Sequence, residues 1–205
     1  MVLTWFSGQS WSRLLEWWLV FLLGLAPFGW ISWQVLFDPF SLGADPAKTI
    51  VLFTGIWTLR WLWLTLAVTP VRKLFRWGWP MRYRRMWGLY CWFYATLHLM
   101  SFVAFILGWR MDLLTQELAE RPYIIVGFTA FLLLAPLGFT STKKMQRRLG
   151  KRWLQLHKLV YLIAILAMVH FIWLVRSSWL EVSIYGVILM LLLGYRLRQW
   201  SRSGR

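Results

Sequence analysis

The class of fold is indicated by one stretch, Leu149 to Leu174, which reads LGKRWLQLHKLVYLIAILAMVHFIWL. It passes from a basic turn into an apolar run long enough for a membrane-spanning helix, which needs about 20 apolar residues. The stretch carries His157 and His170, two of the three histidines in the chain, and His98 lies in another apolar run. Because an imidazole inside a membrane helix is unfavourable without a partner, these three side chains are the first candidates for function.

The composition extends this interpretation to the whole chain. Of 205 residues, 60% are hydrophobic, only 15% are charged and 18 are tryptophan, which excludes an ordinary soluble domain. Repeated apolar runs near 20 residues predict an all-α, polytopic membrane helix bundle. The connecting segments leave no room for a separate soluble domain, so residues 1–205 are interpreted as one domain, and we identify no convincing internal repeat.

Six transmembrane helices are expected, the first kinked by Pro27 and the second ended by Pro70. A brief turn near Arg176 to Trp179 is expected between the last two. The six predicted spans are Leu14–Trp33, Ile50–Thr69, Met86–Leu107, Tyr123–Thr140, Trp153–Val175 and Leu180–Leu197.

The charges indicate how the chain crosses the membrane. A net charge of +16 could suggest nucleic acid, but the basic residues cluster beside the ends of apolar runs, which favours a lipid bilayer as the partner and no nucleic acid. The loops within 72–85 and 143–152 are purely basic and alternate with mixed or acidic loops. The positive-inside rule then places both basic loops and the N and C termini in the cytoplasm.

The third and fifth spans run in the same direction, and each carries a histidine in its outer half. At 1.5 Å per residue, His98 lies ~18 Å and His170 roughly 25 Å from the cytoplasmic ends of their spans. Two imidazoles at similar depth on facing helices are the axial ligands that a b-type haem requires. In the alternative interpretation, each histidine only donates a hydrogen bond to a neighbouring helix.

The other two candidates are His157 and Arg60. His157 lies only about 6 Å from the cytoplasmic end of its span, and its third-span counterpart would be Arg84 or Arg85, so it is either a ligand of a second haem or an interfacial histidine. Arg60 lies midway along the second span, and no acidic residue lies in the core of any span. A haem propionate is therefore its predicted partner, with snorkelling or a hydrated crevice as the alternative.

Several motifs in the same order resemble the ferric reductase-like transmembrane domain family, which includes the membrane domain of NADPH oxidases. Within it, the resemblance is to membrane subunits of bacterial protein-methionine-sulfoxide reductase systems, and it covers about residues 20 to 198. The motifs are LGADP (42–46), FTG (53–55), TP (69–70), RRMWGLYCWFYATLHL (84–99), RPY (121–123), FTSTKKMQRRLGKRW (139–153) and LHKLVYLIAILAMVH (156–170).

The resemblance implies haem b and FMN as cofactors in a bacterial inner membrane. It implies a subunit that takes electrons from the quinone pool or a cytosolic flavin reductase and passes them to a periplasmic molybdopterin-containing subunit. That partner would reduce methionine sulfoxide in oxidised periplasmic proteins. His98 and His170 match the family's haem ligands, and His157 matches a third histidine linked to a second cofactor. The alternatives are a stand-alone transmembrane ferric or quinone reductase and a non-redox membrane anchor.

Overall fold

The computed structural model describes residues 11–174 and 179–203, and these are helical or in short turns, without a strand. Six helical segments are long and apolar enough to cross a membrane, which confirms the all-α, six-span prediction. These segments are Trp11–Phe37, Pro46–Phe75, Trp79–Ile106, Pro122–Phe139, Lys151–Leu174 and Trp179–Arg202.

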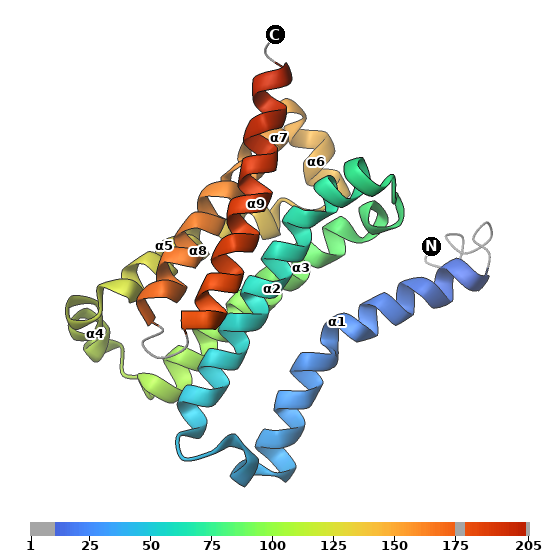
Figure 1. The fold of residues 1–205 in the computed structure, drawn as a ribbon. Coiled ribbons are helices and arrows are strands. Elements are labelled where there is room, and N and C mark those ends of the chain that lie inside the picture. The colour runs from blue at the N-terminus through green and yellow to red at the C-terminus, as the bar shows by residue number, and fades with distance from the viewer. Residues whose placement is uncertain (1–10, 175–178, 204–205) are drawn as a thin grey trace. The chain divides into compact units, whose positions relative to one another are not determined.

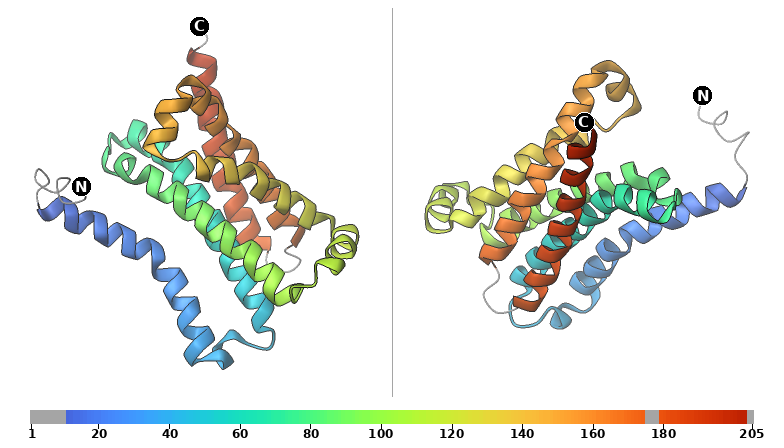
Figure 2. Two further views of the ribbon diagram at one scale, coloured as in Figure 1. Left: turned by 180° about the vertical axis from the view of Figure 1, so that it is seen from behind. Right: turned by 45° about the horizontal axis from the view of Figure 1, so that its top comes forward.

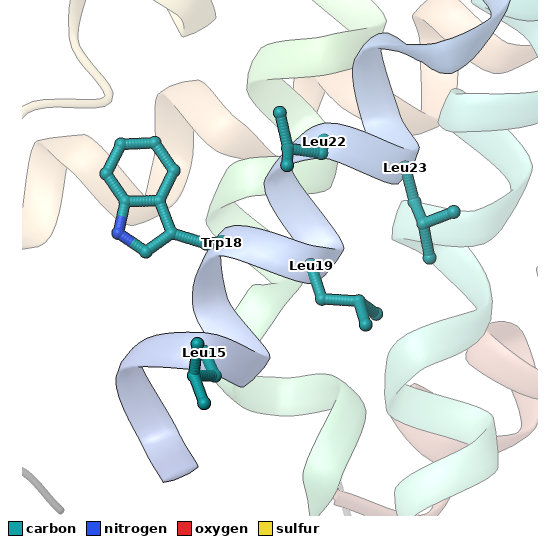
Figure 3. A pocket seen from close by; sticks show the side chains of 5 residues that line it. All are labelled: Leu15, Trp18, Leu19, Leu22 and Leu23. Carbon is teal, nitrogen blue, oxygen red and sulfur yellow. The ribbon is translucent and has the colours of Figure 1, made fainter. Parts of the chain in front are cut away.

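The first unit of the chain ends at Pro46 and is described by itself. It consists of α1 (Trp11–Phe37) and the 3₁₀ turn η2 (Pro39–Leu42). Pro27 lies inside α1, and the helix changes direction part-way along its length (Figure 1). Large apolar side chains project from its N-terminal half (Figure 3), as expected of a helix that contacts lipid. They are Leu15, Trp18, Leu19, Leu22 and Leu23.

The second unit, residues 47–205, contains the three histidines and the other spans. Three short elements, η4, α4 and α6, connect the longer helices. The elements are α2 (Pro46–Phe75), α3 (Trp79–Ser101), a π-helical turn η3 (Phe102–Ile106), η4 (Met111–Leu113), α4 (Leu114–Glu120), α5 (Pro122–Phe139), α6 (Lys143–Leu149), α7 (Lys151–His157), α8 (Leu159–Leu174) and α9 (Trp179–Ser203).

Within this unit, α5 and α8 pack closely along their lengths, α3 packs on α5, and α8 on α9 (Figures 1 and 2). Large side chains join α2 to α3 and to α9. Trp57 of α2 packs on Tyr94 of α3, and Trp63 of α2 donates a hydrogen bond to the carbonyl of Tyr185 in α9. Tyr94 is fully buried at the centre of this packing.

Two details differ from the sequence-based expectations, and a third lies mostly outside the described residues. The second span does not end at Pro70, because α2 continues to Phe75; prolines are tolerated in membrane helices when neighbouring groups satisfy the freed carbonyl. The basic loop at 143–152 forms α6, whose first turn is capped by Thr142, and the mixed loop forms η4 and α4. The turn expected near 176–179 lies outside the described residues except for Trp179, which begins α9.

Candidate functional site

His98 and His170 lie side by side. His98 is near the end of α3 and His170 near the end of α8, and their ring centroids are 6.2 Å apart with the planes at 77°. The similar depth inferred from the sequence is thus accompanied by direct proximity. That the two histidines bind iron stays a prediction.

Each ring is oriented by a backbone carbonyl of a neighbouring helix. His98 Nδ1 lies 2.9 Å from the carbonyl oxygen of Val51 in α2, and His170 Nδ1 lies 2.7 Å from that of Tyr123 in α5. Because a carbonyl oxygen only accepts, Nδ1 carries the proton in both rings, which leaves the Nε2 lone pair of each neutral imidazole free for a metal ion.

The distance between the rings fits one metal ion between them. A metal–imidazole bond is about 2 Å and Nε2 lies roughly 1 Å from the ring centroid, so two rings on opposite sides of one metal ion have centroids about 6 Å apart. Across residues 11–174 and 179–203, no group of three or more His, Cys, Asp and Glu residues could hold a metal ion. Two imidazoles alone suit an iron whose remaining ligands come from a macrocycle.

Two glycines allow the rings to approach the neighbouring helices. A Cβ atom on Gly127 of α5 would lie 2.7 Å from both Cε1 and Nδ1 of His170. A Cβ atom on Gly55 of α2 would lie 3.0 Å from Cε1 of His98. Neither glycine was recognisable as a site residue from the sequence alone, although Gly55 stands in the FTG motif.

Arg60 is paired within the protein. Its Nε donates a 2.8 Å hydrogen bond to the hydroxyl of Tyr185 on α9, and its guanidinium carbon lies 4.8 Å from the ring centroid of Trp57. Tyr185 also contacts Phe171, the residue after His170, with ring centroids 5.7 Å apart. Arg60 is therefore linked to Phe171, the neighbour of His170, through Tyr185, a residue that no sequence motif had indicated.

His157 lies at the end of α7, 13 positions before His170. Its ring stacks on Trp153 with centroids 3.8 Å apart, and its Nδ1 lies 3.0 Å from the carbonyl oxygen of Trp153. The backbone of Leu137 in α5 is a second hydrogen-bond partner of the ring. The residue of the third span that lies near His157 is Arg84, one of the two that the sequence had suggested. The histidine of α3, His98, lies at the other end of that helix.

The predicted cytoplasmic end of the unit is rich in cations. A groove between the ends of α2 and α9 is lined by residues that include three cations and no acid, and Lys73 donates a 3.0 Å hydrogen bond to Gln199 across it. Nearby, the guanidinium of Arg196 lies 5.4 Å from the ring centroid of Tyr161. The groove residues are Lys73, Leu74, Tyr195, Arg198, Gln199 and Arg202.

Comparison with known proteins agrees with this architecture. Residues 54–168 match the family described as ferric reductase like transmembrane component. The chain is 44% identical over 191 residues to the protein-methionine-sulfoxide reductase heme-binding subunit MsrQ of Polaromonas naphthalenivorans, covering 91% of this chain and 86% of that protein. It is 46% identical to MsrQ of Xanthomonas axonopodis pv. citri, covering 87% and 84%, and 47% identical to that of Xanthomonas campestris pv. campestris, covering 87% and 83%.

The chain therefore belongs to the ferric reductase-like transmembrane family. Its six helical spans, and the neighbouring histidines on the third and fifth of them, agree with this assignment. Within that family, the relatives that it matches over most of its length are MsrQ subunits, which confirms the resemblance drawn from the sequence motifs. No solved structure matches the chain.

Proposed function

We propose that this chain is a haem b-containing electron-transfer subunit of a bacterial inner-membrane protein-methionine-sulfoxide reductase system. The observation that carries the proposal is the His98–His170 pair, in which both Nδ1 atoms donate to carbonyls and both Nε2 atoms remain free. The names of the relatives support it, since these are haem-binding subunits of such systems. Haem iron held by two imidazoles exchanges one electron at a time without gaining or losing a protein ligand.

The chain's own residues would hold the group by three kinds of contact. His98 and His170 would give the axial bonds, each imidazole made more basic by its Nδ1–H···O=C hydrogen bond. Arg60 forms its described hydrogen bond through Nε alone, so its two terminal nitrogens can donate to a propionate. Tyr185 would hold the guanidinium in place while it does so.

A second cofactor is proposed at the cytoplasmic end. His157 is the candidate ligand for a second haem, and Arg84 beside it is not a ligand for iron, so the other axial position would need a different donor. FMN is proposed from the family resemblance, and the groove with Lys73, Arg198 and Arg202 offers cations for its phosphate.

The proposed direction of flow follows the depth of these sites. Electrons would enter at the cytoplasmic end from the quinone pool or a cytosolic flavin reductase, and leave from the His98–His170 level for the periplasmic molybdopterin-containing subunit MsrP. Reduction of one methionine sulfoxide to methionine and water consumes two electrons and two protons, so a one-electron carrier acts twice for each sulfoxide repaired.

The test is to purify the chain and record its reduced-minus-oxidised absorption spectrum, then to add MsrP and oxidised methionine in membrane vesicles with a chemical donor. Haem bands together with MsrP-dependent sulfoxide reduction support the proposal. Haem bands without transfer to MsrP favour a stand-alone ferric or quinone reductase. A chain without haem bands is a membrane anchor and contradicts the proposal.

A further inference from the structure

The surroundings of the two histidines repeat along the sequence. His98 bonds to the carbonyl of Val51 and His170 to that of Tyr123, and both bonds join residues 47 positions apart. Adding 72 to positions 51, 55 and 98 gives 123, 127 and 170, so carbonyl, glycine and histidine recur together. The expectation of no internal repeat is therefore wrong at the level of these contacts.

The start of the second helix in each copy follows the same period. Gly78 precedes the first residue of α3 as its N-cap, and Gly150, 72 positions later, precedes the first residue of α7. The segments α2–α3 and α5–α8 thus form two copies of one unit that follow each other in the same direction. Parallel repeats of this kind are related by an axis along the membrane normal. The two histidines are corresponding residues of the two copies.

Helix geometry explains why a glycine accompanies each carbonyl. The carbonyl of residue i accepts the amide of residue i+4, so Gly55 lies one turn after Val51 and Gly127 one turn after Tyr123. Helical side chains tilt toward the N-terminus, so a side chain at i+4 would cover the carbonyl of residue i. A glycine at i+4 leaves that carbonyl accessible to a donor from another helix.

We propose that Gly55 and Gly127 are positioning residues, each of which uncovers the carbonyl that fixes the proton and the plane of one axial histidine. The two copies thereby leave the Nε2 lone pair of each ring free, with the ring centroids 6.2 Å apart. This inference rests on the proposed haem function. It adds two residues that touch neither iron nor substrate and act only through His98 and His170.

The two positions differ in how much space they leave. The 2.7 Å approach at Gly127 forces the His170 ring or the helix to move, whereas the 3.0 Å approach at Gly55 needs an adjustment of a few tenths of an ångström. Gly127→Ala is expected to weaken haem binding about ten- to a hundredfold, as for other lost outer-shell contacts. Gly55→Ala is expected to keep haem and to change its ligand geometry.

Two glycines in the same unit provide controls. A Cβ atom on Gly88 in α3 would meet only Thr65 at 3.8 Å, and one on Gly194 in α9 would meet nothing within 4 Å. Gly88→Ala and Gly194→Ala therefore add the same methyl group without touching a histidine. Each of the four variants and the unchanged chain is purified in detergent, and helix content, haem per chain and the electron paramagnetic resonance spectrum of ferric haem are recorded.

The inference predicts shifted low-spin g-values in Gly55→Ala, a high-spin signal or loss of haem in Gly127→Ala, and unchanged spectra in both controls. Unchanged g-values in Gly55→Ala together with normal haem in Gly127→Ala overturn it. If Gly127→Ala does not fold, Gly55→Ala decides alone. Absence of haem from the unchanged chain would instead reject the proposed function, so the two failures are distinguishable.

Discussion

The imidazole ring of His98 lies 6.2 Å from that of His170, between centroids, with the planes at 77°. The two side chains come from the ends of α3 and α8, and each is held by a carbonyl of a different neighbouring helix. Neither ring depends on the other for its orientation. Each ring is thus oriented by the backbone of another helix, and preorganisation of this kind reduces the entropy lost when a ligand is bound.

The first prediction concerns the two histidines themselves. His98→Ala and His170→Ala should each abolish the main haem, because one remaining axial ligand leaves a five-coordinate, weakly held macrocycle. Haem per chain, measured as the pyridine haemochrome of purified protein, should fall at least tenfold in both variants. Normal haem content in either variant would show that the two residues are not an axial pair.

The second prediction concerns Arg60. Arg60→Leu should lower haem retention or its midpoint potential, since removal of a nearby cation disfavours the more negative, reduced state and leaves a buried carboxylate without its partner. Arg60→Lys should restore part of the effect, because it keeps the charge but not the planar fork. The measurements are haem per chain and a redox titration.

Tyr185→Phe distinguishes a role of Arg60 in haem binding from a role in the packing of α2 on α9. It keeps the ring that packs on Phe171 but removes the hydroxyl that accepts from Arg60. Loss of this hydrogen bond should lower the free energy of unfolding by about 1 kcal/mol and leave haem bound. If Arg60→Leu behaves like Tyr185→Phe, with haem and potential unchanged, Arg60 serves only the packing of α2 on α9.

The sequence was sufficient to predict features that repeat over many residues. The lengths of the apolar runs predicted six spans, and the similar depth of His98 and His170 in parallel spans predicted that the two histidines would be close. It was not sufficient for Gly55 and Gly127, because a glycine in a helix signals its role only when the ring that packs on it is known. The partner of Arg60 escaped prediction because Tyr185 is 125 positions away and lies on another helix.

The repeat was missed for a related reason. The two copies share the histidine, the glycine that its ring packs on and the glycine that precedes the helix of that histidine, but most of their other residues differ, as Trp57 and Trp61 do from Thr129 and Leu133. In the first copy, Trp57 packs on Tyr94 and Trp61 on Tyr90. Only the contacts reveal the period.

A third prediction uses one difference between the copies. The hydroxyl of Thr54 lies 2.9 Å from the carbonyl oxygens of both Ile50 and Val51, so it competes with His98 for the second of these acceptors. Its counterpart 72 positions later is Val126. Thr54→Val should strengthen the hydrogen bond from His98, make the imidazole more basic and lower the midpoint potential.

This shift should be smaller than about 59 mV, which is a tenfold change for a one-electron couple. Val126→Thr is the matched variant in the second copy and should move the potential in the opposite direction. A redox titration of both purified proteins checks the pair. A rise in potential in Thr54→Val would show that the threonine hydroxyl supports, rather than competes with, the hydrogen bond of His98.

A fourth prediction concerns the entry of electrons. His157→Ala should slow reduction by the cytoplasmic donor and leave the outer haem bound and oxidisable from the periplasmic side. Stopped-flow reduction in vesicles of known orientation measures this, with Gln155→Ala, an exposed neighbour on α7, as the control. Reduction of the His157 variant at the native rate would make this residue an interfacial histidine that stacks on Trp153.

His98 and His170 are proposed to bind one haem iron from opposite sides. Pulsed electron paramagnetic resonance of the purified, oxidised protein labelled with ¹⁵N-histidine tests this proposal most directly. We expect a low-spin ferric signal coupled to two axial imidazole nitrogens in the unchanged chain, and the loss of this signal from both the His98→Ala and the His170→Ala protein. A haem signal with both couplings retained in either variant, or no haem in the unchanged chain, would contradict it.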